Sequence, residues 1–344
     1  MGTVGIERAD GGQRRICLLG ATGTIGRATL RALVGRGHSV VCFVRPERSG
    51  ESSAPSPRSR TLDVLTGEGA TVRFAQFDDP VSLARDGFGS DPFDAIISCM
   101  ASRTGAPRDA WAVDHQAHLT VLKAGIEAGV GQFVLLSAIC VQRPRLAFQH
   151  AKLAFEAALA NSGMRYSIVR PTAYFKSLSG QIDRLKRGKP FLVFGDGTLT
   201  ACKPISDADL GIYLANCLDD SDCWNRILPI GGPGPAITPR DQGAELFRLL
   251  GRPPKFKQVP LAVLDAIIGG LSLAGRIVPS LADKAELARI GRYYASESML
   301  VFDPVAGRYD ADLTPSFGSD TLFDYYARLV AGTETLERGD HAVF

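Results

Sequence analysis

Short apolar runs alternate with amphipathic segments from residue 16 to residue 232. The short runs are apolar at successive positions, as in strands that are buried on both faces of a parallel sheet. Between them, apolar residues recur three and four positions apart, which predicts helices that cover the sheet. The predicted strands are 16–19, 39–44, 71–74, 94–100, 133–137, 166–169 and 227–232. The alternation predicts an α/β fold with a Rossmann-like, doubly wound parallel sheet.

After the sixth predicted strand the alternation loosens. Residues 191–197 pass from an apolar run into two glycines, which predicts a hairpin. Ser206 is expected to cap the helix that follows it. Residues 253–330 are mostly helical and apolar, and we assign them to the side that covers a substrate. The expected organisation is a flexible N-terminus (1–13), a core domain (14–252, with parts of 176–205 facing the substrate) and a smaller, mainly helical region with the tail (253–344).

The first predicted strand turns into a helix through a glycine-rich run. Glycines at such a turn let the backbone approach a pyrophosphate, and the helix N-terminus offers free N–H groups and a favourable dipole. The spacing GxxGxxG is a weak signal by itself, because structural turns also need glycine. Here the apolar strand before it and the helical apolar face after it favour a dinucleotide site. The expected contacts with the cofactor are Gly20, Thr22, Gly23, Thr24, Ile25 and Gly26.

The second predicted strand ends on Arg45, with Arg48 close behind. In NAD-preferring Rossmann folds an acidic residue at this place accepts from the ribose 2′-hydroxyl, whereas arginine suits a 2′-phosphate. The cofactor is therefore expected to be NADPH, bound by the core domain. Residues 46–60 are either a mobile loop that closes over the adenosine or a mere insertion. Asp78, after the third strand, either faces the adenine or caps the next helix.

Ligands of parallel sheets lie beyond the carboxyl ends of the strands. The residues expected to contact the cofactor at three of these ends are Ser98, Cys99, Met100, Ser137, Pro171 and Thr172. A long helix is predicted over 109–129. Its His115 and His118 are interpreted as packing or surface residues, because no other ligand stands at metal spacing.

Composition excludes several classes of function. The 344 residues are 45% hydrophobic and 22% charged, which suffices for a large core. The net charge is only +3, without a long basic run, so a nucleic-acid partner is not supported. Seven cysteines without a CxxC pair indicate buried, reduced thiols and no metal site.

Two stretches bear on the location of the protein. Residues 1–14 lack the composition of a signal or transit peptide, so the protein is expected to be cytoplasmic, of bacterial type. The apolar stretch 259–274 is too short to span a bilayer. At most it makes a transient contact with a membrane surface.

Five segments of the chain match one known family. They are GATGTIGR (20–27), FVR (43–45), FVLLSAICV (133–141), FQHAKLAFE (148–156) and IVRPTAYFKSLSGQ (168–181). Together they resemble the atypical, NmrA-like short-chain dehydrogenase/reductases, and among these most closely the divinyl chlorophyllide a 8-vinyl reductase family. The likeness extends over roughly residues 14–330, and its last two segments are the most specific. It implies an NADPH-dependent oxidoreductase acting on a CH–CH group, which converts the 8-vinyl group of a divinyl chlorophyllide or protochlorophyllide to ethyl in (bacterio)chlorophyll biosynthesis.

The resemblance includes a departure at the catalytic pair. Ordinary members of the superfamily carry Tyr-x-x-x-Lys, in which the tyrosine protonates an alkoxide and the lysine binds the nicotinamide ribose. Here Phe148 stands at the tyrosine position, while Lys152 is kept. A hydride added to a vinyl group conjugated with a macrocycle gives a delocalised carbanion, so no acid is needed at an oxygen. Lys152 is expected to anchor the ribose and to aid catalysis, or else to form a salt bridge on the helix surface, for instance with Glu156.

Other features stay open from the sequence. The proton comes from water or from a nearby acid, for which the candidates are Tyr174, His150 and Lys176. Tyr174 joins Lys152 as an expected catalytic residue. A flat tetrapyrrole needs an apolar slot, for which the candidate aromatic residues are Phe175, Phe256, Tyr293 and Tyr294. Two alternative functions remain: reduction of another conjugated double bond, as in isoflavone-reductase-like proteins, and a non-catalytic NmrA-like sensor or scaffold that binds NAD(P).

Overall fold

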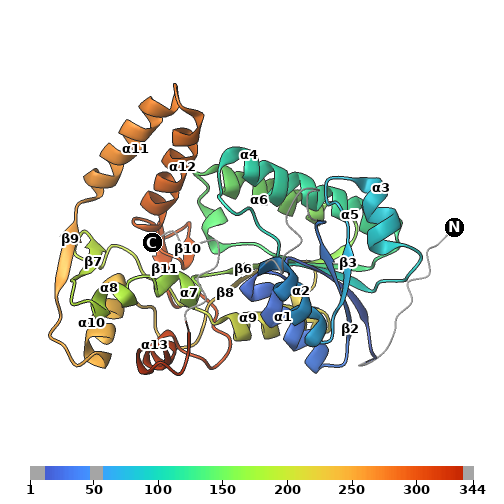
Figure 1. The fold of residues 1–344 in the computed structure, drawn as a ribbon, viewed down its shortest axis with the longest axis horizontal. Helices are drawn as coiled ribbons and strands as arrows, with labels where there is room; N and C mark the ends of the chain where they lie inside the picture. Colours follow the sequence, from blue (N-terminus) through green and yellow to red (C-terminus); the bar gives the residue numbers. More distant parts are fainter. Residues whose placement is uncertain (1–11, 47–56, 336–344) are drawn as a thin grey trace.

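The computed structural model describes residues 12–46 and 57–335. Most of the predicted flexible N-terminus (1–13), Arg48 and the end of the tail (336–344) lie outside the described residues. The described chain forms two lobes side by side (Figure 1). One lobe is a sheet flanked by helices, and the other is mostly helical with two small sheets.

A sheet of seven parallel strands forms the centre of the first lobe, in the order β3-β2-β1-β4-β5-β6-β8. Its strands are β1 (Arg15–Leu19), β2 (Ser39–Val44), β3 (Thr71–Phe74), β4 (Ala95–Ser98), β5 (Gln132–Leu136), β6 (Arg165–Pro171) and β8 (Arg226–Ile230). Each of them was predicted from an apolar run, and the predicted α/β, doubly wound fold is confirmed. The strand order reverses between β1 and β4, which is where doubly wound sheets bind their ligands.

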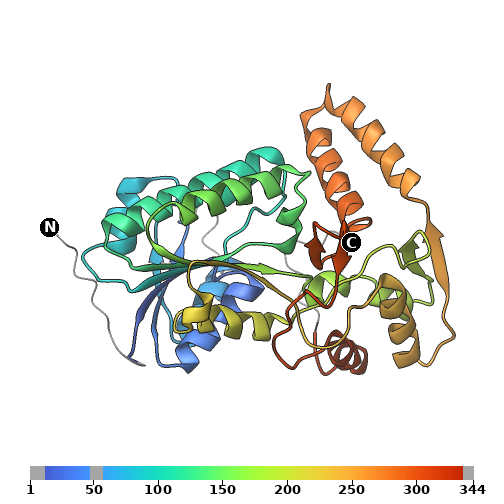
Figure 2. The same ribbon diagram turned by 180° about the vertical axis from the view of Figure 1, so that it is seen from behind.

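Helices cover both faces of this sheet (Figure 2). One face carries α1 (Thr24–Gly35), α2 (Pro57–Gly67) and α9 (Asp207–Asn216). The opposite face carries η1 (Leu83–Phe88), α5 (His118–Glu127) and α6 (Ala147–Ala160). Each layer buries an apolar cluster, with Leu30 and Leu33 on the first face and Phe88 and Phe155 on the second. As predicted, Ser206 caps α9, since its hydroxyl accepts the N–H of Asp209 at 3.0 Å.

The long helix predicted over 109–129 is continuous but irregular. It consists of α4 (Pro107–Ala110), the π-helical segment η2 (Trp111–Ala117) and α5. A π-helical turn contains an extra residue and so redirects the side chains around it. In η2 it brings Asp114, which is only 1% exposed, into contact with α6. Three short helical turns complete this lobe: α3 (Pro80–Ser82), η3 (Ile139–Gln142) and η4 (Ser221–Cys223).

The second lobe has its own apolar core. Its helices are α7 (Phe175–Leu178), α8 (Ile182–Lys186), α10 (Pro239–Leu249), α11 (Leu261–Gly275), α12 (Pro279–Tyr294) and α13 (Leu322–Ala331). Its strands are β7 (Phe191–Phe194), β9 (Phe256–Val259), β10 (Val301–Asp303) and β11 (Arg308–Asp310). The core contains residues of η3 and α6 as well, so the second lobe is packed directly against the carboxyl edge of the large sheet.

The hairpin predicted for residues 191–197 is wrong. The strand in this segment, β7, pairs in parallel with β9, which lies far along the chain. Gly195 and Gly197 do form a turn with positive φ, at +59° and +86°. The chain that leaves this turn does not fold back on β7, because β9 occupies that edge and the carbonyl of its Val259 accepts the N–H of Gly195 at 3.2 Å.

Helices α11 and α12 form an antiparallel pair that projects from the body of the protein (Figure 1). The pair is held by two polar bridges, Arg292 to Asp265 at 2.8 Å and Arg289 to Ser272 at 2.7 Å. Although the sequence of α11 is strongly apolar, none of its residues is buried. The apolar stretch 259–274 is thus an exposed helix, and no helix among the described residues is long and apolar enough to span a membrane.

Candidate active site

The glycine-rich turn between β1 and α1 brings three elements into close contact. Gly20 has φ +75°, and a Cβ there would lie 2.6 Å from the carbonyl of Cys99, which follows β4. A Cβ on Gly26 would collide with the carbonyl oxygen of Gly20. Gly23 is exposed, and the nearest atom to a Cβ there would be 3.4 Å away. Two glycines therefore allow close packing, while the third leaves the entrance to the helix open.

The N-terminus of α1 suits a pyrophosphate. Gly23 is its N-cap residue, so no side chain caps the helix, and its first turn has no acidic residue. The N–H groups of this turn and the positive end of the helix dipole thus point to open space. Thr22 is exposed and Thr24 half-buried beside this space, while Ile25 is buried beneath it. These residues fit the diphosphate of a dinucleotide.

The residues expected at the adenosine end lie at the same edge of the sheet. Arg45 is exposed and follows directly on β2, whose Phe43 pairs with Leu19 at the end of β1. Of the segment 46–60, residues 57–60 belong to α2, and most of the rest lies outside the described residues. The capping role considered for Asp78 is wrong, because Asp79 caps α3 by accepting the N–H of Val81 at 2.9 Å. Asp78 is exposed beside this cap.

Beyond β4, the side chains point away from the cofactor edge. The Ser98 hydroxyl lies 2.8 Å from Nε2 of His118 in α5, and the Cys99 thiol lies 3.6 Å from the hydroxyl of Thr29 in α1. Met100 is buried. A cofactor would therefore meet mainly backbone atoms here. Burial, reinforced by the charge of Lys152, lowers the pKa of His118 to about 4, so its imidazole is neutral.

Beyond β5 and β6, the predicted polar side chains bind other protein groups. The Ser137 hydroxyl donates to the buried carboxylate of Glu156, which also forms an ion pair with Arg170. The Thr172 hydroxyl donates to the carbonyl of Lys203 at 2.5 Å. Pro171 ends β6 and is buried opposite Ile230 of β8. These side chains hold the sheet edge together, so a ligand at this edge would meet mainly their backbone.

Lys152 forms an ion pair with Asp114 rather than with Glu156, so the alternative based on i,i+4 spacing is wrong. The Lys152 ammonium lies 3.0 Å from Asp114 Oδ1, and the two side chains are 12% and 0% exposed. Asp114 Oδ1 also accepts the N–H of Ser102 at 3.2 Å. Asp114 Oδ2 is buried without a hydrogen-bond partner among the described residues. The Lys152–Asp114 pair at the carboxyl edge of the sheet thus has one acceptor atom, Asp114 Oδ2, that is not used.

Asp114 is a site residue that the sequence alone did not single out. It was hidden because the helical periodicity of 109–129 placed it between the apolar positions. The only signal for its role would have been an aspartate within an apolar helix that packs close to the retained Lys152.

Phe148 lies under α12. Its ring is 9% exposed and belongs to the apolar cluster of the second lobe, together with Ile290 and Tyr293 of α12. A Cβ on Gly105 would touch both Ile290, at 2.7 Å, and Phe148, at 3.7 Å. The position at which related enzymes carry a phenol is therefore filled with apolar atoms.

The three proton donors considered from the sequence lie in different surroundings. His150 is exposed on α6, and Lys176 is half-buried on α7. Tyr174 is half-buried and packs against the apolar cluster beneath α1 and α9. Burial raises the pKa of Tyr174, with smaller effects of Asp207 and of the thiols Cys99 and Cys140. Tyr174 is therefore the one that lies near the ends of β4 and β5.

A hollow of about 310 Å³ lies between the helical pair and the beginning of α6. It is lined by Arg145, Leu146, Asp265, Ile268, Arg289, Arg292, Tyr293 and Ser296. Leu146 is the N-cap residue of α6, which carries Lys152. This hollow therefore adjoins the element that bears the expected catalytic lysine.

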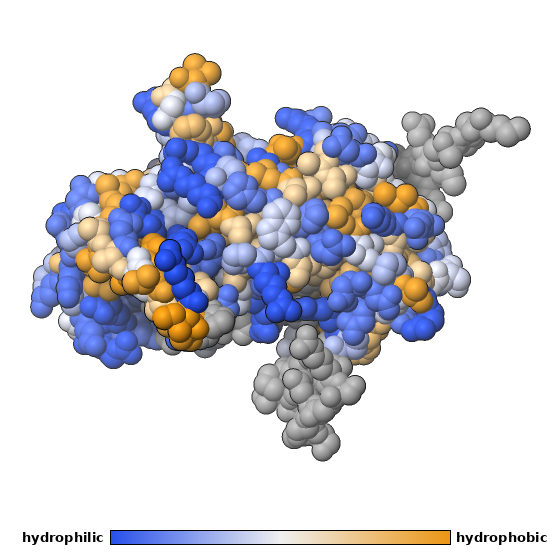
Figure 3. Space-filling model, turned by 90° about the horizontal axis from the view of Figure 1, so that it is seen from above, coloured by the Kyte–Doolittle hydropathy of each residue, from blue (hydrophilic) through white to orange (hydrophobic). Residues whose placement is uncertain are grey.

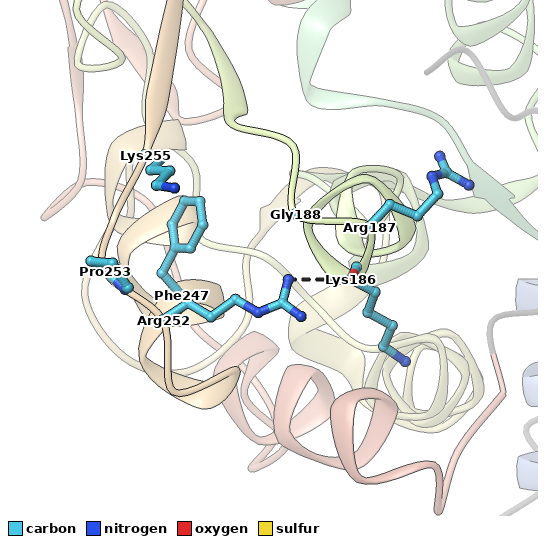
Figure 4. A pocket seen from close by; sticks show the side chains of 7 residues that line it. All are labelled: Lys186, Arg187, Gly188, Phe247, Arg252, Pro253 and Lys255. Atoms are coloured by element: carbon cyan, nitrogen blue, oxygen red, sulfur yellow. Dashed lines mark hydrogen bonds between the residues drawn. The ribbon is translucent and has the colours of Figure 1, made fainter.

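A second hollow, of about 490 Å³, contains none of the predicted site residues (Figure 4). It is lined by Lys186, Arg187, Gly188, Phe247, Arg252, Pro253 and Lys255. Two of its cationic groups bind backbone carbonyls: Arg252 donates to Leu185 at 2.5 Å, and Lys186 donates to Leu329 at 3.2 Å. These contacts tie α8 to α10 and α13, so this basic hollow has a structural explanation.

Comparisons with known proteins agree with this site. A family of NAD(P)H-binding domains matches residues 20–221, which confirms the predicted nicotinamide cofactor. The divinyl chlorophyllide a 8-vinyl-reductase of Oryza sativa subsp. indica is 48% identical over 96% of this chain and 82% of its own. The enzyme of the same name from Arabidopsis thaliana is 46% identical over 92% and 76%. Among solved structures, leucoanthocyanidin reductase from Vitis vinifera with NADPH has a TM-score of 0.66 at 16% identity, covering 92% of this chain and 99% of its own.

The expected cytoplasmic location is contradicted by these relatives, since both reductases are named as chloroplastic. The expectation rested only on the composition of residues 1–14. The composition of so short a segment does not determine the compartment in which a protein works.

The identity over nearly the whole chain and the NAD(P)H-binding match point to the same family as the retained lysine and the missing phenol. This protein belongs to the divinyl chlorophyllide a 8-vinyl-reductase family of NAD(P)H-binding oxidoreductases.

Proposed function

We propose that this chain uses NADPH to reduce the 8-vinyl group of 3,8-divinyl chlorophyllide or protochlorophyllide to an ethyl group. The observation that carries the proposal at the site is the apolar filling around Phe148 beside a retained, charged Lys152. An alcohol or ketone substrate needs an acid at its oxygen, and Phe148 cannot supply one. A conjugated vinyl group has no such need, since the charge left by hydride addition spreads over the macrocycle.

The preference for NADPH rests on Arg45. Its guanidinium is exposed at the end of β2, next to the glycine-rich turn, where a dinucleotide places its adenosine ribose. A planar guanidinium matches a phosphate through two parallel hydrogen bonds. NADPH supplies a hydride from its nicotinamide, which the ends of β4, β5 and β6 would hold.

Lys152 and Asp114 contribute positioning and charge. The ion pair fixes the lysine on α6, and its side chain remains 12% exposed. A cation near the reacting carbon favours a negatively charged transition state in a site from which water is largely excluded. Orientation of the vinyl group against the nicotinamide supplies the remaining acceleration.

The second lobe is proposed to cover the pigment. Of the four aromatic residues considered for the slot, Phe175 is buried against Tyr325 and Phe256 packs on Phe191 and Phe247, so these two belong to the core. Tyr293 is also buried, whereas Tyr294 is 37% exposed. The second lobe would therefore meet the active-site edge through the C-terminal end of α12.

The assay for this function follows the pigment directly. Purified protein is incubated with NADPH and divinyl chlorophyllide, or with divinyl protochlorophyllide, and a blue shift of the Soret band is expected as the 8-vinyl group leaves the conjugated system. Intact NADPH binding without any shift would contradict the proposal. That result would favour a non-catalytic NAD(P)-binding sensor or scaffold, which the loss of the phenol also permits.

A transient contact with a lipid surface is proposed for the free end of the helical pair. Leu273 and Ile277 are 65% and 86% exposed there, next to the exposed cation Arg276. The view from above shows hydrophobic and hydrophilic residues side by side on this face of the molecule (Figure 3). Apolar side chains beside a basic residue suit the interface of an anionic membrane. The test is flotation with phosphatidylglycerol vesicles. The double change Leu273→Ser/Ile277→Ser should abolish binding, whereas Val305→Ser, at a residue 95% exposed elsewhere in the lobe, should not; equal binding of both variants would contradict the contact.

A further inference from the structure

The last residues of α12 reach the active-site edge in a defined way. The Tyr293 hydroxyl donates to the carbonyl of Cys140 at 2.9 Å and lies 3.1 Å from that of Arg143. Both carbonyls belong to the turn η3 or follow it directly, and this turn follows β5. Tyr293 is only 4% exposed. It anchors α12 on the same loop that runs past the expected nicotinamide position.

The neighbouring residue, Tyr294, presents a phenol to the same place. Its hydroxyl lies 3.8 Å from the Cys140 thiol, while 37% of the residue remains exposed. Desolvation and the Cys140 thiol raise the pKa of Tyr294 well above its usual value, so its hydroxyl end is buried and protonated at neutral pH. The exposed fraction therefore belongs largely to the ring, which faces the space beside α12.

Cys140 links this phenol to the catalytic lysine. Burial raises the pKa of the Cys140 thiol, while its contact with Tyr294 and the positive charge of Lys152 both lower it. Tyr174 is also close enough to raise the pKa of Tyr294. The Tyr294 hydroxyl thus belongs to a group of polar atoms from α12, η3 and α6 that meets at the carboxyl edge of the sheet.

We propose that Tyr294 is the proton donor of the reduction, a phenol supplied by the covering helix in place of the one that Phe148 lacks. The inference rests on the proposed function. The cofactor's hydride forms the C–H bond at the terminal vinyl carbon, and the carbon–carbon π electrons pass to the macrocycle. The Tyr294 O–H then breaks, and its proton forms the second C–H bond at the inner vinyl carbon. Solvent reprotonates the tyrosinate after the product has left and water has entered the site.

The alternatives fit this role less well. The Tyr174 ring is packed against the cluster beneath α1 and α9, and His150 lies on the exposed side of α6. The Lys152 ammonium is held by Asp114. It stabilises a tyrosinate by its charge without giving up its own proton. Tyr294 combines a hydroxyl that lies 3.8 Å from the Cys140 thiol with a residue that is 37% exposed.

The test compares three single variants with the wild-type protein. Tyr294→Phe should lower the rate of the Soret shift by about 100-fold or more, because a general acid contributes roughly that factor. Pigment affinity, measured by absorbance titration without NADPH, should stay within threefold of wild type. Tyr174→Phe tests the nearest alternative, because a loss of turnover as large as that of Tyr294→Phe would overturn the inference. Tyr166→Phe, at the opposite end of β6, is the matched control and should behave like wild type.

Chemical rescue separates proton transfer from packing. Tyr294→Ala should regain turnover with millimolar phenol and not with toluene, which has the same shape without the O–H group. Rescue by both would overturn the inference, and so would a loss of pigment binding that matches the loss of turnover. Nearly normal turnover of Tyr294→Phe would overturn the inference as well. The proposed function would still stand in that case, because the wild-type protein would still reduce the pigment. If wild-type protein itself gave no Soret shift, the proposed function would fail first.

Discussion

Replacing Asp114 by asparagine removes one charge from the buried pair and changes little else. The amide keeps an oxygen at the position of Oδ1, which accepts from Lys152 and from the N–H of Ser102. The Lys152 ammonium, whose side chain is 12% exposed, is left without its counter-charge. The substitution therefore isolates the electrostatic part of the interaction.

The size of the effect follows from the geometry. Two unit charges 3.0 Å apart attract by about 5 to 6 kcal/mol at an effective dielectric constant of about 20. Part of this attraction is already offset by the desolvation of both groups, and breaking one side of a buried pair costs about 3 to 5 kcal/mol. Because the amide keeps its hydrogen bonds, we expect the free energy of unfolding to fall by about 3 kcal/mol and turnover to fall about tenfold.

The assay is urea unfolding of a double-mutant cycle: wild type, Asp114→Asn, Lys152→Met and the double variant. A coupling free energy of about 2 kcal/mol or more between the two sites is expected. Coupling close to zero, or a loss of less than about 1 kcal/mol with unchanged turnover, would refute the view that this pair holds the catalytic lysine.

Three further changes test other parts of the site. Arg45→Ala should raise the Kd for NADPH at least tenfold more than that for NADH in fluorescence titrations; equal effects would remove the role of Arg45 at the 2′-phosphate. Phe148→Tyr should bring no gain in turnover and should cost about 1 to 3 kcal/mol in urea unfolding, because it buries a hydroxyl against Ile290; a faster enzyme would contradict the assignment. The pKa of His118, lowered to about 4 by burial, lies below its unfolded value of about 6.5. Stability should therefore be highest above about pH 6.5 and fall as the pH decreases toward 4, and this slope should be smaller in His118→Gln; parallel curves for the two proteins would be the contrary result.

The strands and the dinucleotide turn were predictable because their signals are local. β2 and β3 match the predicted ranges residue for residue. In β2 the reason is burial on both faces, which requires an apolar residue at nearly every position. The glycine-rich turn was likewise recognised from its immediate neighbours, and the close approach of Gly20 to Cys99 gives it a physical reason. Patterns of this kind need no knowledge of partners elsewhere in the chain.

The hairpin and the partner of Lys152 were mispredicted because both depend on distant segments. β7 looked like half of a hairpin, but its pairing partner is β9, more than sixty residues further along the chain. Glu156 looked like the partner of Lys152 by helical spacing, but Arg170 and Ser137 already bind it. The actual partner of Lys152 is Asp114, which lies in the π-helical turn η2. Helical periodicity does not predict such a turn.

The two residues that we propose to act with Lys152 come from segments outside the helix that bears the lysine. Asp114 lies in the π-helical turn η2 and contacts Lys152 directly. Tyr294 lies at the end of α12 and contacts Cys140 at the edge of the sheet. The family's usual phenol would sit one helical turn before Lys152, at Phe148, where α12 now packs. Because α12 surrounds Phe148 with apolar atoms, it leaves no room there for water or for a phenol carried by α6. The acid that we propose comes instead from the covering helix, where the Tyr294 hydroxyl lies 3.8 Å from the Cys140 thiol.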